Sequence, residues 1–268
     1  MKYINNSINI TSLAIPGTHN SCSNKFHEQQ KSDVQFRMIN QIWSINEQLN
    51  AGIRYFDLRP GYKYIYHGNY STIYTLDYVL NLFKNFLEKY PSEFLIVRFQ
   101  YSNLSWVDNP FSIENYLVKI IKKYDKLFYK LKEFPKIKDI RGKIYPFVEL
   151  FEYSNFTNWT DSVNKTFYLQ DYFELKIKFF YQRPREIKKK RNLIKEYIKL
   201  AKNMEDNILI INHCSAKNKY IKATSFYTSL MFNEVPFKEK NLKGVFVFDF
   251  PSELLIKHII NQNLLSLE

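Results

Sequence analysis

Five side chains of the sequence belong to types that together could cleave a phosphodiester. His19 and His67 each follow a run that predicts a β-strand, Asp57 and Arg59 stand two residues apart on another predicted strand, and Asp249 ends the last one. Positions two apart on a strand point to the same face. One imidazole can accept a proton while the other donates one. The arginine can bind a phosphate and a carboxylate can fix a histidine tautomer, so the set suits attack of an internal hydroxyl on phosphorus without a metal.

Each of these residues also has a plain structural interpretation. A single histidine after a strand is more often a surface or hydrogen-bonded residue, and a buried arginine–aspartate pair is more often structural. The catalytic interpretation therefore depends on one condition, which is that the fold brings the five side chains to the same place.

The chain alternates between short apolar runs and helical patterns, an arrangement that predicts an α/β fold. The predicted strands span residues 12–15, 53–58, 64–66, 94–99, 143–148, 166–169, 208–211 and 245–248. The first predicted helix begins after Thr75 and has Val79, Leu80, Phe83, Phe86 and Leu87 on one side. The others cover 112–131, begin near Pro184, and lie near 220–231 and 252–260. Residues 101–111 and 151–165 are predicted to be loops. Eight such units in about 250 residues predict a (β/α)8 barrel, one domain over residues 1–268, with an open doubly wound sheet as the alternative. In a barrel the carboxyl ends of the strands meet at one rim, where active sites lie.

Composition limits the class of protein. The 268 residues include 23 Phe, 21 Tyr and 3 Trp, which excludes disorder as the main state. We find no apolar run as long as a membrane span and no secretory signal. Cys22 and Cys214 are too few for a disulfide framework and predict reduced thiols in a cytoplasmic compartment. The formal charge of +13, concentrated in residues 101–202, favours an anionic partner. Because no phosphate loop, zinc knuckle or RNA-binding strand is present, we expect a membrane surface and no nucleic acid.

Three segments carry a resemblance to a known family. Residues 13–21 (LAIPGTHNS), 52–60 (GIRYFDLRP) and 66–68 (YHG) resemble the signature of the phosphatidylinositol-specific phospholipase C X-domain family, in its small single-domain, bacterial-like type. Residues 90–97, 141–144, 169–171 and the strand before Asp249 also fit, so the resemblance covers about residues 8 to 260. It implies a distorted TIM barrel in which an inositol 2-hydroxyl attacks phosphorus, diacylglycerol leaves and an inositol cyclic phosphate forms.

The resemblance also implies roles for individual residues. These are His19 as general base, His67 as general acid, Arg59 on the phosphate, Asp249 orienting His19, Asp57 supporting Arg59, and Asp171 contacting inositol hydroxyls. No cofactor is implied.

The sequence departs from the bacterial pattern at several of these positions. Asn20 stands where metal-free members have an aspartate that assists the acid histidine, and asparagine there is typical of calcium-dependent enzymes. Those enzymes have an acidic residue in place of Arg59, and a guanidinium would repel a cation, so we expect metal independence. The ring-contacting lysine, arginine and stacking tyrosine fall at Gln100, Glu149 and Phe173. A different headgroup, such as a glycosylated or phosphorylated inositol, is therefore a hypothesis.

Other interpretations stay open. A barrel that binds phospholipid but has lost turnover would explain Asn20, and a metal-dependent enzyme acting on lysophospholipid or sphingomyelin is a weaker alternative. His19, Cys22, His213 and Cys214 could suggest zinc, but adjacent residues rarely bind one ion.

We expect a monomer, peripherally associated with membranes. The basic run 188–191 would be a solvated helix face or a lipid contact, and the candidate lipid-facing aromatics are Phe26, Phe36, Trp106 and Phe111.

Overall fold

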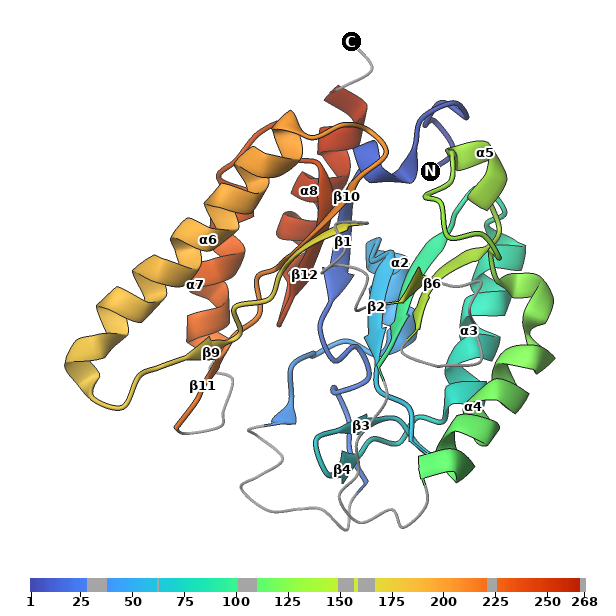
Figure 1. The fold of residues 1–268 in the computed structure, drawn as a ribbon, viewed down its shortest axis with the longest axis horizontal. Coiled ribbons are helices and arrows are strands. Elements are labelled where there is room, and N and C mark those ends of the chain that lie inside the picture. The colour runs from blue at the N-terminus through green and yellow to red at the C-terminus, as the bar shows by residue number, and fades with distance from the viewer. Residues whose placement is uncertain are drawn as a thin grey trace.

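The protein is described by a computed structural model, built around a sheet of eight parallel strands (Figure 1). The structure describes residues 1–27, 38–61, 63–100, 110–148, 157–158, 167–220 and 226–265. The strands of the sheet are β1 (Ala14–Thr18), β2 (Tyr55–Leu58), β5 (Leu95–Phe99), β6 (Ile144–Val148), β7 (Thr157–Asn158), β8 (Phe167–Gln170), β10 (Leu209–His213) and β12 (Gly244–Phe248).

The order of the strands is that of a TIM barrel. Around the sheet they run β7-β6-β5-β2-β1-β12-β10-β8, so chain order is followed from β1 to β7 in one direction, and the last strand pairs with the first. Within the described residues, this series of pairings has β7 and β8 as its two ends. The predicted TIM-barrel class is confirmed, and the carboxyl ends of the strands point to the same side (Figure 1).

The prediction that residues 64–66 form a strand of the barrel is wrong. Residues in this region form an antiparallel hairpin of β3 (Tyr66–His67) and β4 (Tyr70–Ser71) outside the sheet. Ile65 and Tyr66 are buried in the same hydrophobic cluster as residues of α3, described below, which accounts for the apolar run. The remaining strand of the barrel is β7, which lies in the segment 151–165 that was predicted to be a loop. Two residues are too few to give a strand pattern.

Helices cover the outside of the sheet (Figure 1). They are α2 (Ile45–Ala51), α3 (Leu76–Lys89), α4 (Pro110–Lys123), α5 (Ile137–Ile140), α6 (Arg183–Asn203), α7 (Phe226–Phe237) and α8 (Glu253–Leu265), with short 3-10 turns η1 (Ile10–Ser12), η3 (Asp125–Leu127) and η5 (Phe180–Gln182). The helix predicted over 112–131 is shorter and ends at Lys123. Within the described residues, no helix is both long and apolar enough to cross a membrane.

Helix α3 shows how the sequence determines these elements. The Thr75 hydroxyl caps it by accepting a hydrogen bond from the Tyr78 backbone N–H at 3.1 Å. All five predicted apolar positions are buried against the sheet, which confirms the predicted stripe. Asp77 near its start and Lys89 near its end complement the helix dipole.

The interior of the barrel is apolar below the rim. Alternate strand residues such as Ile15, Tyr55, Phe147 and Val245 form one inner cluster. At Gly17 an added Cβ would lie 2.7 Å from the Tyr55 Cβ, so this position has no room for a side chain. Gly17 therefore lets β1 approach β2 closely, two residues before His19 (Figure 1).

Candidate active site

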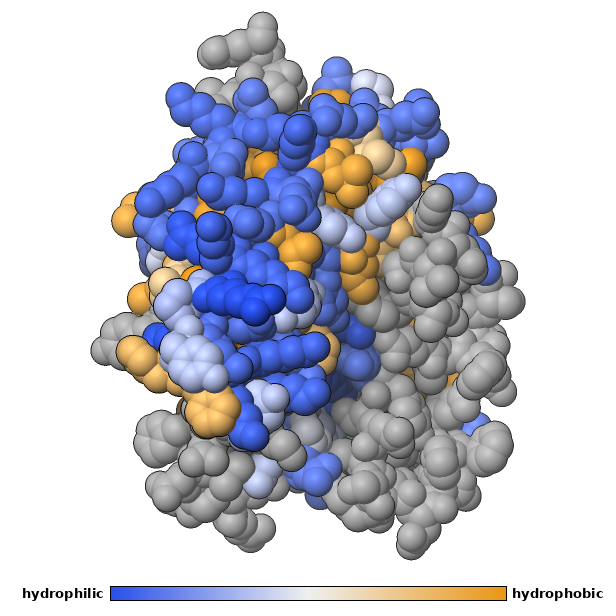
Figure 2. Space-filling model, turned by 60° about the vertical axis from the view of Figure 1, so that its left-hand side comes forward, coloured by the Kyte–Doolittle hydropathy of each residue, from blue (hydrophilic) through white to orange (hydrophobic). Residues whose placement is uncertain are grey.

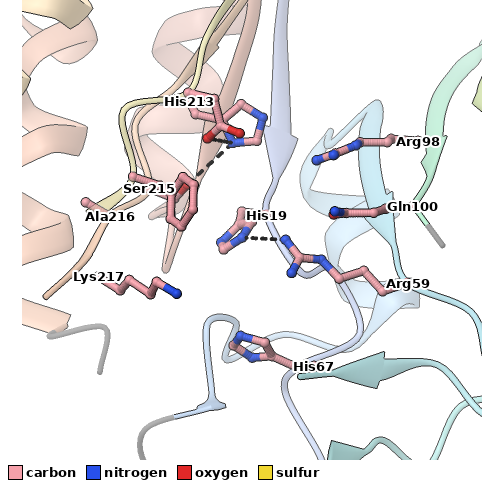
Figure 3. Close-up of a pocket in the computed structure, with 11 residues that line it drawn as sticks. His19, Arg59, His67, Arg98, Gln100, His213, Ser215, Ala216 and Lys217 are labelled. Carbon is pink, nitrogen blue, oxygen red and sulfur yellow. Dashed lines mark hydrogen bonds and ion pairs between the residues drawn. The ribbon is translucent and has the colours of Figure 1, made fainter. Parts of the chain in front are cut away.

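A pocket opens at the carboxyl ends of the strands, and it is lined by charged side chains, imidazole rings and a phenyl ring (Figure 3). Its walls come from β1, β2, β3, β5, β8 and β10 and the segments that follow them. The lining residues are His19, Arg59, His67, Arg98, Gln100, Asp171, Phe173, His213, Ser215, Ala216 and Lys217. The fold thus brings His19, Arg59 and His67 into one pocket. Their proximity is a condition of the catalytic interpretation of the sequence.

His19 follows β1 and is held between a carboxylate and a guanidinium. Its Nδ1 lies 2.9 Å from Oδ1 of the buried Asp249. Its Nε2 lies 3.1 Å from Nη2 of Arg59 (Figure 3). A carboxylate accepts and a guanidinium only donates. His19 is therefore the neutral tautomer with hydrogen on Nδ1, and its Nε2 lone pair accepts the hydrogen bond of Arg59, which also lines the pocket.

His67 faces His19 from the β3–β4 hairpin, with ring centroids 6.4 Å apart. Its Nδ1 donates to the backbone carbonyl of Met38 at 2.7 Å, which fixes hydrogen on Nδ1 and leaves Nε2 for a ligand. Burial lowers the pKa of His67 to about 3, with further lowering by the charge of Arg59. At neutral pH this imidazole is therefore uncharged.

Asp57 is buried beneath the pocket between two guanidiniums. Its Oδ2 lies 3.4 Å from Nη2 of Arg59 and its Oδ1 lies 3.7 Å from Nη1 of Arg98. Burial alone would raise the pKa of Asp57, but Arg59 and Arg98 outweigh burial and hold this pKa well below its usual range. Asp57 thus lies close to two arginines, and its role in supporting Arg59 stays a prediction.

Asn20 does not share hydrogen-bond partners with His67. Its side-chain N–H donates to Oδ1 of Asn40 at 3.2 Å, and its backbone N–H donates to Oδ2 of Asp57 at 3.1 Å. Its φ of 44° lies in the left-handed region, which asparagine tolerates better than most residues. The orientation of His67 therefore comes from the carbonyl of Met38 instead of the side chain at position 20.

The other sequence-predicted contacts lie mostly on the pocket wall. Gln100, Asp171 and Phe173 all line it, and Phe173 is 41% exposed. Glu149 lies outside the described residues. The placement of these side chains is compatible with ligand contact, and their roles remain predictions.

Five lining residues were not predicted from the sequence as pocket residues: Arg98, His213, Ser215, Ala216 and Lys217. Two of them, Arg98 and His213, are buried and ionisable, and His213 was considered only as a zinc ligand. His213 is buried at the end of β10, with its ring centroid 6.1 Å from that of His19 and its Nδ1 3.9 Å from Oδ1 of Asp171. Burial lowers the pKa of His213 to about 4, although Asp171 acts in the opposite direction. Arg98 lies on β5 opposite Asp57. A charged residue inside an apolar strand was the available signal for Arg98.

The described residues give no support for zinc. They contain no cluster of three or more histidine, cysteine, aspartate or glutamate side chains able to hold a metal ion. Cys22 and Cys214 are free and buried in different hydrophobic clusters.

Two surface expectations need correction. Lys190, within the run predicted to be solvated, is fully buried. Phe26, predicted to face lipid, is 6% exposed. Phe36, Trp106 and the side chain of Phe111 lie outside the described residues.

The site has the parts for phosphoryl transfer to an internal hydroxyl. An acceptor nitrogen, a guanidinium and a second imidazole nitrogen line the same pocket, so a phosphodiester bound to Arg59 would lie between a base and an acid.

Comparisons with known proteins agree with this chemistry. No protein-family model matches the chain. It is 28% identical to the 1-phosphatidylinositol phosphodiesterase of Listeria monocytogenes over 98% of this chain and 84% of that protein. Its structure is similar to that of a phosphatidylinositol-specific phospholipase C from L. monocytogenes, with a TM-score of 0.81 and 26% identity over 98% of this chain and 97% of the other. A phosphatidylinositol-specific phospholipase C from Staphylococcus aureus has the same fold, with a TM-score of 0.76 and 19% identity over 98% and 96%.

Proposed function

We propose that this protein is a phosphodiesterase of the phosphatidylinositol-specific phospholipase C type. The observation that carries the proposal is the placement of His19 and His67 beside Arg59 in one pocket, with ring centroids 6.4 Å apart and each Nδ1 in a hydrogen bond. Similarity to the Listeria phosphodiesterase over nearly the whole chain supports it.

The reaction needs His67 in its cationic form. The bound phosphodiester anion raises the pKa of His67, whose Nε2 then takes up a proton from solvent. His19 Nε2 takes the proton of the inositol 2-hydroxyl, whose oxygen then bonds to phosphorus. The bond from phosphorus to the diacylglycerol oxygen breaks, and the proton on His67 Nε2 passes to the leaving alkoxide. Arg59 stabilises the negative charge that develops on the phosphoryl oxygens, and Asp249 stabilises the His19 cation. The products are diacylglycerol and inositol 1,2-cyclic phosphate.

The proposed reaction is independent of metal. Arg59 and Arg98 present two guanidiniums to the pocket, and a divalent cation there would be repelled. Arg59 can supply the charge stabilisation that a metal would otherwise provide.

Release of inositol cyclic phosphate from phosphatidylinositol vesicles in excess EDTA tests the proposal. We expect product from the wild type at a rate that the chelator leaves unchanged. Absence of product from every inositol lipid would refute the function, and loss of activity with EDTA would refute metal independence.

A barrel that binds phospholipid without turnover is the alternative, motivated by Asn20. The bond from His67 to Met38 weakens this alternative, because the acid histidine is oriented without help from position 20. The alternative predicts co-sedimentation with vesicles and no product. Catalysis appearing only in Asn20→Asp would indicate an enzyme weakened at this position.

The natural headgroup is proposed to differ from unmodified phosphatidylinositol. Gln100 and Phe173 line the pocket where the resemblance implies a lysine and a tyrosine, while the catalytic set is kept. Relative rates on plain, glycosylated and phosphorylated inositol lipids would identify the preferred headgroup.

The pH dependence of the rate should change when substrate binds. In the free enzyme the pKa of His67 is lowered to about 3, and a bound phosphodiester anion will raise it. The pKa values of the free enzyme govern the pH dependence of kcat/KM, and those of the enzyme–substrate complex govern the pH dependence of kcat. We therefore expect the pKa of the essential acid to be higher in the kcat profile than in the kcat/KM profile. Rates on a water-soluble short-chain phosphatidylinositol would measure both profiles, and equal pKa values for the acid in the two profiles would contradict this prediction.

We propose that the enzyme docks on anionic membranes through the segment before α6. Three consecutive aromatic residues there are exposed: Phe179 at 49%, Phe180 at 85% and Tyr181 at 74%. The exposed basic residues around them are Lys176, Lys178, Arg183, Arg185, Lys188 and Lys189. The face that carries α6 is mostly hydrophilic, with some hydrophobic side chains at its edge (Figure 2). Aromatic side chains among basic ones suit the interface of an anionic bilayer.

The double variant Phe180→Ser/Tyr181→Ser should bind phosphatidylserine-containing vesicles about tenfold or more weakly, because two aromatic side chains no longer enter the interface. Its activity on soluble substrate should be unchanged. Tyr3→Ser, which replaces an exposed aromatic near the N-terminus, is the control. Equal vesicle binding by all three proteins would exclude this surface. The cytoplasmic location expected from the cysteines stays a prediction.

A further inference from the structure

Helix α6 places two charged side chains inside the protein, on the side that faces the pocket wall. Glu186 is 9% exposed and Lys190 is 0% exposed. They stand four residues apart and therefore share one face of the helix. Neither residue lines the pocket, and the proposed reaction uses neither of them.

Lys190 makes hydrogen bonds to the end of β8 and to the segment that follows it. Its ammonium donates to Oε1 of Gln170 at 3.2 Å and to the carbonyl of Tyr172 at 2.7 Å. Gln170 in turn donates to Oδ1 of Asn212 at 2.9 Å and to the carbonyl of His213 at 2.8 Å. Lys190 thus lies behind two neighbouring strands at the point where both reach the pocket.

Glu186 holds the same segment at a second point. Its Oε2 accepts from the Tyr172 hydroxyl at 2.7 Å and from the Lys176 backbone N–H at 2.9 Å. Together, Glu186 and Lys190 contact residues 170, 172 and 176 from the helix side. We call this pair the α6 clamp.

Between these anchored residues lie two residues that line the pocket. Asp171 and Phe173 alternate with Gln170 and Tyr172, so the clamped side chains point to α6 while their neighbours reach the cavity. The Phe173 carbonyl also accepts from the Lys217 N–H at 2.8 Å, which joins this segment to the wall that follows β10.

A buried ammonium at this position is costly, which argues for a purpose. Desolvation lowers the pKa of Lys190 to about 8, while Cys214, Asp171 and Asp249 act to raise it. None of the ion pairs recorded in the described part of the chain includes Lys190. An apolar side chain at position 190 would avoid this desolvation cost. What an apolar side chain could not provide is the hydrogen bonds that Lys190 makes to Gln170 and Tyr172.

We infer that Glu186 and Lys190 are positioning residues that set the headgroup-binding wall of the pocket, acting through Asp171 and Phe173. The inference rests on the proposed function. Because the clamp contacts the wall and not the two catalytic imidazoles, it affects substrate binding more than the chemical step.

The test compares Lys190→Met with Lys199→Met, which removes an exposed lysine from the same helix. The substrate is dibutanoylphosphatidylinositol below its micelle concentration, so membrane docking does not enter. Lys190→Met should raise KM about tenfold or more, as loss of a charged hydrogen bond would, and should change kcat less than about threefold. Lys199→Met should match the wild type. Thermal unfolding of each variant separates loss of binding from loss of folding.

A double-mutant cycle tests the route through the wall. If Lys190 acts by placing Asp171, Lys190→Met should add little to KM once Asp171→Asn is present. A KM effect of the same size in both backgrounds would exclude that route. Should Lys190→Met fail to fold, Glu186→Gln decides instead, with a KM increase of about threefold or more expected.

The outcomes distinguish the clamp from the proposed function. A wild type that cleaves the substrate, beside a folded Lys190→Met variant with unchanged KM, overturns the clamp alone. The proposed function, and with it the role of the clamp in headgroup binding, is overturned if the wild type cleaves neither this substrate nor any other inositol lipid and the His67→Ala variant binds none of them by calorimetry.

Discussion

The His19→Ala variant is expected to retain less than about one thousandth of the wild-type kcat. The substitution removes the acceptor for the proton of the attacking hydroxyl. It also removes the ring that Arg59 contacts at 3.1 Å and leaves the carboxylate of Asp249 without the imidazole that it holds at 2.9 Å. Because the base acts in the chemical step, kcat should fall much more than KM rises. Release of inositol cyclic phosphate measures the effect.

His258→Ala provides the matched control. This histidine lies on α8, where its Nε2 contacts the carbonyl of Glu239, and it is not among the residues of the pocket. We expect its kcat to stay within a factor of about two of the wild type. Substantial turnover by a folded His19→Ala protein would remove His19 from the mechanism.

The second large effect concerns stability. Replacing Asp57 by Asn should lower the free energy of unfolding by about 3–5 kcal/mol, the usual cost of breaking a buried ion pair from one side. The variant leaves Arg59 and Arg98 next to each other without the carboxylate that lies within 3.4 and 3.7 Å of them. Activity should fall too, because Arg59 loses a partner that positions it. Urea unfolding with an activity assay measures both effects.

The sign of the pH dependence gives an independent check on Asp57. Its folded-state pKa is depressed, so its contribution is complete above the pKa of an unfolded aspartate, about 3.9. The contribution is lost as pH falls from there towards the folded-state pKa. The stability difference between wild type and Asp57→Asn should therefore narrow below about pH 4. Asp125→Asn, at an exposed pair with Lys130, should cost less than about 1 kcal/mol. Equal costs for the two variants would show that Asp57 is not a buried counter-ion.

Most of the barrel could be predicted because its strands are buried on both faces. Apolar runs such as 208–211 and 245–248 have no polar side to confuse their assignment. The run 64–66 has the same local composition, yet it pairs within a hairpin. Local composition reports burial and extended backbone, and it carries no information about which strand is the partner.

The site could be predicted in part for a related reason. His19 and Arg59 follow strands directly, so a barrel must bring them to one rim. His213 also ends a strand, but its relevance depends on Asp171 and His19, which are distant in sequence. Lys190 was hidden in a basic run, although Ile187 and Ile194 place it on the buried stripe of α6 at helical spacing.

The pairing of β1 with β12 has a consequence for how activity arises. The catalytic imidazole follows the first strand and its carboxylate follows the last, 230 positions later. A ribosome-bound chain that has not yet released its final segment lacks a competent dyad, as does any fragment cut short by proteolysis. Lipid cleavage therefore requires that β12 has been made and has paired with β1.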